Sequence, residues 1–146
     1  MSKIKWLYKG KELPNRTPTS YGFIYVIEYT TGELYVGKRQ FFSIKTMQPL
    51  KSGEQRDGGV FFNKIVNHKR VTLERVKVEN SWREYIGSSK RGKGLKVKSK
   101  TILHICNDSL NLSYWETYYL FVLDVLRNDM YLNDNIGGKF FSPKIV

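Results

Sequence analysis

Gly22-Phe-Ile-Tyr-Val-Ile-Glu-Tyr-Thr-Thr-Gly-Glu-Leu-Tyr-Val-Gly-Lys38 is the stretch that predicts most about the fold of this chain. Two runs of β-branched and aromatic residues flank a short polar segment that ends in Gly32. This composition is typical of a β-hairpin whose turn contains a glycine. The stretch therefore predicts two antiparallel strands joined by a tight loop.

The loop length decides how the hairpin tyrosines are arranged, because side chains alternate between the two faces of a strand. A two-residue loop would pair Glu28 with Tyr35 and leave Tyr25 on the opposite face. A three-residue loop with Gly32 in the left-handed conformation would pair Tyr25 with Gly37, and both phenols would then share one face. In that register the two hydroxyls could surround one small ligand.

Length and composition limit the class of protein. A chain of 146 residues with 40% hydrophobic residues predicts one domain with its own core. We find no signal peptide or membrane-spanning run, so we expect a cytoplasmic protein without a membrane partner. One cysteine, Cys106, and two histidines argue against a structural zinc site.

The charge of the chain indicates its partner. Lys and Arg number 25 against 13 Asp and Glu, a formal charge of +12. Such an excess of positive charge favours binding to nucleic acids through the release of counterions. We expect residues 1–20 to form an N-terminal arm and residues 43–80 a basic insertion. Within the insertion we expect a long mobile loop up to Gly59, one or two helical turns from Val60, and then a strand.

Residues 87–94 are similar to a phosphate-binding loop, with Gly87, four residues, Gly92 and Lys93. Gly94 stands where such loops need Ser or Thr, and no buried strand precedes it, which argues against ATP binding. The polar side chains between the glycines could instead contact nucleic-acid phosphates, or form a solvated turn.

Glu116 has two interpretations. It follows Ser113 at the spacing of a helix capping box, in which its carboxylate would accept from the Ser113 backbone amide. Alternatively, its carboxylate could bind a hard divalent cation such as Mg²⁺. The strand that we expect at 101–106 and the helix after Ser113 place it near the sheet.

The order of these motifs resembles the GIY-YIG nuclease superfamily. Phe-Ile-Tyr25 precedes Tyr35-Val-Gly37, and the motif residues Trp82 to Ser89, Glu116 and Asn133 follow in the family's order; Phe23 replaces the family's first glycine. The resemblance runs from about Gly22 to Phe140. It implies an α+β fold with a small three-stranded antiparallel central sheet flanked by helices, as in small phage-encoded homing endonucleases.

The resemblance also implies the site residues. They are Tyr25, Tyr35, Arg39, Glu116 and Asn133, with Glu116 holding Mg²⁺ or Mn²⁺. Arg39 is our choice for the catalytic cation, with Lys90 and Arg91 as alternatives. For DNA contact we select Gly37, Lys38, Trp82, Ser88, Ser89, Lys90 and Arg91.

The implied chemistry is metal-dependent hydrolysis of DNA phosphodiester bonds. Tyr25 would orient or deprotonate the attacking water, and a nearby cation would have to lower its pKa from about 10. The rival interpretation is a DNA-binding module that keeps the fold without catalysis. Cleavage specificity, nicking against double-strand cutting, biological role, and a homodimer or protein partner for target choice stay open.

Overall fold

The computed structural model describes residues 4–143, and its contacts divide the chain into two compact units. Met1–Phe41 and Ser81–Val146 form the larger unit, and Phe42–Asn80 form the second, which we call the insertion unit. In the described part of the chain, no helix is long and apolar enough to cross a membrane.

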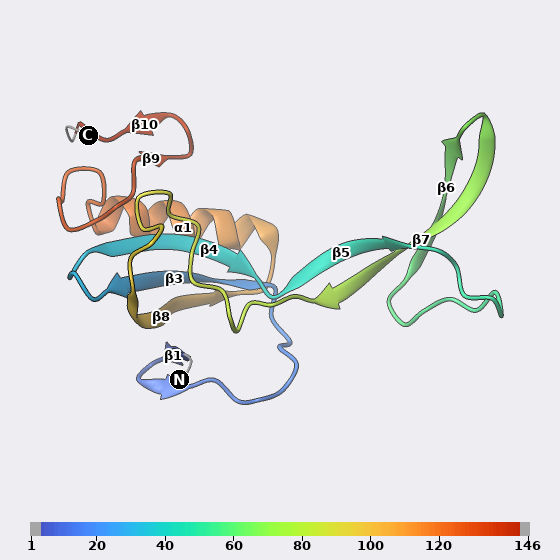
Figure 1. The fold of residues 1–146 in the computed structure, drawn as a ribbon, viewed down its shortest axis with the longest axis horizontal. Coiled ribbons are helices and arrows are strands. Elements are labelled where there is room, and N and C mark those ends of the chain that lie inside the picture. The colour runs from blue at the N-terminus through green and yellow to red at the C-terminus, as the bar shows by residue number, and fades with distance from the viewer. Residues whose placement is uncertain (1–3, 144–146) are drawn as a thin grey trace. The chain divides into compact units, whose positions relative to one another are not determined.

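The larger unit is built on a five-stranded mixed sheet (Figure 1). Its order is β2 (Lys11–Glu12), β1 (Trp6–Tyr8), β8 (Val97–Cys106), β3 (Gly22–Tyr29) and β4 (Leu34–Gln40). Strands β8, β3 and β4 are antiparallel neighbours, whereas β1 runs parallel to β8. The sheet is therefore larger than the three antiparallel strands that we expected, because the N-terminal arm adds β1 and β2 to its edge.

The hairpin β3–β4 has the three-residue loop. The Tyr29 amide donates to the Glu33 carbonyl at 2.9 Å, and Gly32 has a φ of 92°, the left-handed conformation that such a loop needs. Tyr25 pairs with Gly37 and Ile27 with Tyr35. Of the two registers that the sequence left open, the structure has the one that places both phenols on one face.

Within residues 4–143 one helix, α1 (Ser109–Val122), covers one face of this sheet (Figure 1). Its buried residues Leu112 and Leu120 pack with Ile24 of β3 and Val36 of β4 in one hydrophobic cluster. We expected helices on both sides of the sheet. In the described residues the other face carries the aromatic core described below and the irregular, glycine-containing segment 81–96, which lacks a helical hydrophobic pattern.

The helix begins earlier than predicted. Asp108 is its N-cap, and its carboxylate accepts from the Asn111 amide at 2.7 Å. Ser113 lies inside the first turns, so the proposed capping box at Ser113 and Glu116 is wrong. The Asp108 side chain already accepts from a free amide at the start of the helix. The Glu116 carboxylate is therefore not needed as a cap and is available for another role.

The opposite face of the sheet packs an aromatic core. Trp6, Phe23, Phe41 and Trp82 are each at most 3% exposed. The Phe41 and Trp82 rings meet edge to face at 4.8 Å, and the Trp6 indole nitrogen donates to the Trp82 carbonyl at 2.8 Å. This core fixes the start of segment 81–96 against the sheet.

The insertion unit is a three-stranded antiparallel sheet in the order β5 (Phe42–Met47), β7 (Lys69–Glu79) and β6 (Val60–Val66). The helical turns expected from Val60 are wrong, because a run rich in β-branched and aromatic residues forms β6. The expected loop shrinks to residues 48–59. Asn67 and His68, with φ of 50° and 66°, form the tight turn between β6 and β7.

The C-terminal segment continues past α1 to the edge of the main sheet. Leu34 and Tyr131 form a parallel bridge. A separate two-stranded sheet follows, formed by β9 (Asn135–Ile136) and β10 (Phe140–Phe141). The segment between α1 and β9 thus lies beside β4, at the edge where the candidate site is found.

Candidate active site

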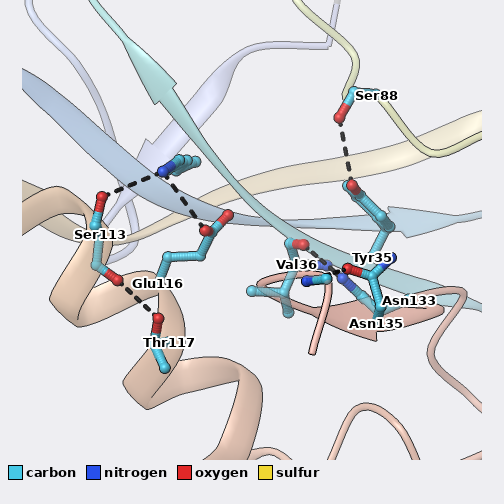
Figure 2. A network of polar contacts seen from close by, with 10 residues as sticks. Tyr35, Val36, Ser88, Ser113, Glu116, Thr117, Asn133 and Asn135 are labelled. Atoms are coloured by element: carbon cyan, nitrogen blue, oxygen red, sulfur yellow. Dashed lines mark hydrogen bonds and ion pairs between the residues drawn. The ribbon is translucent and has the colours of Figure 1, made fainter. Parts of the chain in front are cut away.

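Tyr25 and Tyr35 lie on the sheet face opposite to α1, since Ile24 and Val36 of the same strands face the helix. Their ring centroids are 6.4 Å apart. The Tyr35 and Ser88 hydroxyls form a hydrogen bond of 3.3 Å (Figure 2). The Tyr25 hydroxyl donates to that of Tyr85 at 3.5 Å. Segment 81–96 therefore contacts both phenols through the hydroxyl groups of Ser88 and Tyr85.

Gly37 is required by the position of Tyr25. A Cβ atom at residue 37 would lie 2.5 Å from the Tyr25 hydroxyl oxygen and 2.7 Å from Cζ. We expected the glycine to leave space for a ligand. Instead the Tyr25 ring fills that space, and Tyr25 is fully buried.

The phenols are not activated for proton abstraction. Burial is the main cause that raises the pKa of Tyr25, and the neighbouring Tyr85 raises it further. Burial also raises the pKa of Tyr35, against a smaller lowering by the Ser88 hydrogen bond. We expected a cation to lower the pKa of Tyr25; the structure gives the opposite direction. Both phenols are neutral hydrogen-bonding groups near neutral pH.

Glu116 projects from α1 towards β4 (Figure 2). Lys38 Nζ lies 3.8 Å from its carboxylate oxygen Oε1 and donates to Ser113 Oγ at 3.3 Å. Lys38 and Glu116 therefore meet on the helix side of the sheet, because residue 38 points to the face opposite to Gly37.

The environment of Glu116 fits a bound cation. Burial raises the pKa of its carboxyl group, and the nearby Lys38 only partly opposes this. A half-buried carboxylate that one lysine does not fully compensate would be stabilised by a second positive charge. No cluster of three His, Cys, Asp or Glu side chains suited to a metal occurs among residues 4–143. Such a single carboxylate suits Mg²⁺, which often keeps several waters and binds substrate phosphates.

Asn133 has a structural function in the site. Its side-chain amide donates to the Val36 carbonyl at 2.8 Å, and its carbonyl oxygen accepts from the Val36 amide at 3.1 Å (Figure 2). The Leu34 amide and carbonyl bond to Met130 and Leu132 in the same way, each at 2.7 Å. The Asn133 side chain thus extends the backbone pairing along the exposed edge of β4.

An open pocket of about 340 Å³ lies at this edge of β4, and side chains from both faces of the sheet line it. Tyr35 lines it from the tyrosine side and Glu116 from the helix side. Ser88 and Lys90 border it from segment 81–96, and Asn133 from the segment after α1. Side chains from four separate parts of the sequence therefore converge on one pocket.

The basic residues are distributed differently from our expectation. Arg39 lies on the tyrosine face, where its guanidinium is 4.2 Å from the Tyr85 ring centroid. Its Nε atom is buried and makes no hydrogen bond within the described residues. Arg91 pairs with Asp134 at 3.0 Å, whereas Lys90 borders the pocket. The cation beside Glu116 is Lys38.

Two residues that we selected for DNA contact are buried. Trp82 is 2% exposed within the aromatic core, and Gly37 lies beneath the Tyr25 ring. Neither presents a surface to a nucleic acid in this conformation. Ser89 is only partly exposed, and its hydroxyl accepts from the Gly92 amide at 3.0 Å, which stabilises the loop. Ser88, Lys90, Arg91 and Lys38 are the selected residues that stay accessible.

Sequence reasoning missed two residues that support the tyrosines. Tyr85 contacts both Tyr25 and Arg39, and its position within the Trp-x-x-Tyr motif could have indicated it. Lys100 is buried and donates to the Arg83 and Tyr85 carbonyls at 2.8 and 3.0 Å. Burial lowers its pKa to about 8. In the sequence it stands among alternating lysines, which gave no sign of burial.

The site has the arrangement that the resemblance to the GIY-YIG superfamily implies, with a tyrosine-bearing hairpin, a glutamate-bearing helix and an asparagine at the strand edge. The chain matches, over residues 6–136, the family model described as "Putative endonuclease segE, GIY-YIG domain". The protein therefore belongs to the SegE GIY-YIG family. Comparisons with curated proteins and with solved structures give no match.

Proposed function

We propose that this protein is a divalent-metal-dependent endonuclease that hydrolyses phosphodiester bonds in DNA. The observation that carries the proposal is the pocket at the edge of β4, in which Tyr35 and Glu116 meet from opposite faces of the sheet. Membership of a nuclease family and the formal charge of +12 support it.

Glu116 would hold the metal ion, Mg²⁺ or Mn²⁺, in this pocket. When bound, such an ion polarises the phosphoryl oxygen and stabilises the leaving oxyanion. Lys38 contacts both Glu116 and Ser113, and it would hold the carboxylate in place until a metal ion takes over its charge. Glu116 must be deprotonated to act, so its raised pKa sets the acid limit of activity.

Tyr35 would orient the attacking water or a phosphate oxygen through its hydroxyl, which Ser88 holds in place. Lys90, exposed at the pocket border, would neutralise charge on the scissile phosphate. Hydrolysis joins the water oxygen to phosphorus and breaks the bond to one ester oxygen. One product end carries a phosphate and the other a hydroxyl group.

Tyr25, Arg39 and Asn133 would act through other residues. Tyr25 is fully buried and packs beside Tyr35, so it would position that side chain and Tyr85. Arg39 would fix Tyr85 by stacking on its ring. Asn133 would hold β4 in place at the pocket. We also propose a homing-like biological role in a bacteriophage, because the chain resembles small phage-encoded endonucleases and belongs to this nuclease family.

The test is incubation of supercoiled plasmid with the protein in Mg²⁺, in Mn²⁺ and in EDTA, followed on agarose gels. We expect nicking or linearisation with the metals and none in EDTA. Glu116→Gln should abolish cleavage, whereas Asp129→Asn, which removes a charge from an exposed residue, should leave it unchanged. Plasmid binding without cleavage in every condition would instead favour a DNA-binding module.

A further inference from the structure

The insertion unit carries its own excess of positive charge. Residues 42–80 contain eight Lys and Arg against four Asp and Glu, a formal charge of +4. The strand register sorts these charges between the two faces of its sheet, because opposite residues on paired strands share a face. The distribution over the two faces is unequal.

One face, which we call the cationic face, presents four basic residues from β6 and β7. Lys69 pairs with Val66, Val71 with Lys64, and Arg75 with Val60. Since alternate residues of a strand share a face, these residues and Lys77 point the same way. The four basic residues are Lys64, Lys69, Arg75 and Lys77, all exposed. Glu79 is the acidic residue that shares this face.

The opposite face is partly closed by the loop of residues 48–59. The Arg56 amide donates to the Glu74 carboxylate at 2.7 Å, and the Arg56 guanidinium forms an ion pair with it. Glu74 is fully buried by this contact. Lys45 and Arg70 are the basic strand residues of this face. Because the loop already binds here, the cationic face is the better candidate for an external partner.

Aromatic rings hold two of the cations against the cationic face. The Arg75 guanidinium lies 4.2 Å from the Phe62 ring centroid, and Lys77 Nζ lies 4.5 Å from that of Phe42. Side chains held in this way lose less conformational entropy when they bind a partner. Ile44 pairs with Lys77 and Val60 with Arg75, and these two side chains are 64% and 61% exposed, so the same face offers apolar contact.

We propose that the cationic face docks duplex DNA along its phosphate backbone. Lys69 and Lys77 are eight residues apart on β7, about 27 Å in a strand that rises about 3.4 Å per residue. One DNA strand carries a phosphate about every 3.4 Å along the helix axis, so the face spans roughly eight phosphates. A β-ribbon also fits the major groove. The choice of DNA as the polyanion rests on the proposed function.

The test is fluorescence anisotropy of a labelled DNA duplex in EDTA over a series of salt concentrations. Two variants remove two charges each from the cationic face, Lys64→Gln with Lys69→Gln and Arg75→Gln with Lys77→Gln. The matched control, Lys45→Gln with Arg70→Gln, removes two charges from the opposite face. The first variant leaves both cation–ring contacts intact, so it guards against a loss of folding in the second.

We expect the cationic-face variants to bind roughly tenfold more weakly and to reduce the salt slope by about 1.8, since each lost phosphate contact removes about 0.9. The control should change binding much less. Equal weakening by all three variants, no weakening by either cationic-face variant, or tighter binding to RNA than to DNA would overturn the proposal. EDTA prevents metal-dependent cleavage, so this assay measures binding alone. Binding of the wild type here, together with no cleavage of plasmid in Mg²⁺ or Mn²⁺, would reject the proposed function and not this one.

Discussion

Lys38 Nζ lies 3.8 Å from Glu116 Oε1, so the carboxylate that would hold the metal is paired with a lysine of the neighbouring strand. The pair is half-exposed and joins β4 to α1. A lysine in this place would stabilise the empty site. It would also compete with an incoming metal ion for the same carboxylate.

Lys38→Met should therefore lower the Mg²⁺ concentration that the site requires. Removing the lysine charge leaves Glu116 with less compensation, so a divalent cation gains more on binding. Calorimetric titration of the DNA-free protein with Mn²⁺ measures this directly, with Glu116→Gln as the variant that should not bind. Weaker binding of Mn²⁺ by Lys38→Met would contradict the competition.

Asp108→Ala should lower the unfolding temperature of the protein, because the helix N-cap loses its hydrogen bond to the Asn111 amide. The low pKa of Asp108, held down chiefly by that backbone hydrogen bond, is consistent with this function. Thermal unfolding followed by circular dichroism checks the loss. Glu116→Gln should show no comparable loss, and a larger loss for Glu116→Gln than for Asp108→Ala would restore the capping-box interpretation.

Gly37→Ala should destabilise the protein by about 1–3 kcal/mol through overpacking. The added methyl group would lie 2.5 Å from the Tyr25 hydroxyl oxygen, and the surrounding core prevents the ring from moving. Urea unfolding measures the change in free energy. In a Tyr25→Leu background, which lacks the ring, Gly37→Ala should cost less stability than it does in the wild type. If Gly37→Ala alone were as stable as the wild type, the Tyr25 ring would have moved to make room for the methyl group, and the prediction would be wrong.

The cleavage rate should fall at acid pH, where Glu116 becomes protonated, and should show no change from ionisation of Tyr25 or Tyr35. Burial raises the pKa of Glu116 above its ordinary 4.5, so activity should fall as the pH decreases through that raised value. The pKa values of Tyr25 and Tyr35 are raised from 10.0, so neither phenol ionises below about pH 10. Single-turnover rates between about pH 5 and 9 test this. A rise in rate with an apparent pKa near 8 would indicate an activated phenol.

The hairpin could be predicted from the sequence because two runs of β-branched and aromatic residues flank a segment that ends in Gly32. Its register could not, because loops of two and three residues both fit the pattern and only the structure selects the three-residue loop that places the two tyrosines on one face. The helix start was misplaced because the sequence holds two capping signals, Asp108 and the Ser113–Glu116 pair, and only the fold selects between them. Packing of the helix against the sheet, which the local sequence does not reveal, sets the start at Ser109.

Burial was the property that the sequence revealed least. Trp82 was selected for DNA contact, and the sequence around Lys100 gives no sign of burial, yet both side chains lie in the core. The Lys100 ammonium donates to the carbonyl oxygens of Arg83 and Tyr85, and the sequence next to Lys100 does not indicate these acceptors. Likewise, Lys38 rather than Arg39 faces Glu116, because a one-residue step along β4 changes the face.

The central claim is that Tyr35 and Glu116 act on one phosphate in one pocket. The most direct measurement compares single-turnover cleavage rates of the wild type, Tyr35→Phe, Glu116→Asp and the double variant at saturating Mg²⁺. We predict that the double variant is little slower than the slower single variant, because groups that act as a unit are not additive. Rate losses that multiply, or no metal-dependent cleavage by the wild type, would contradict the claim.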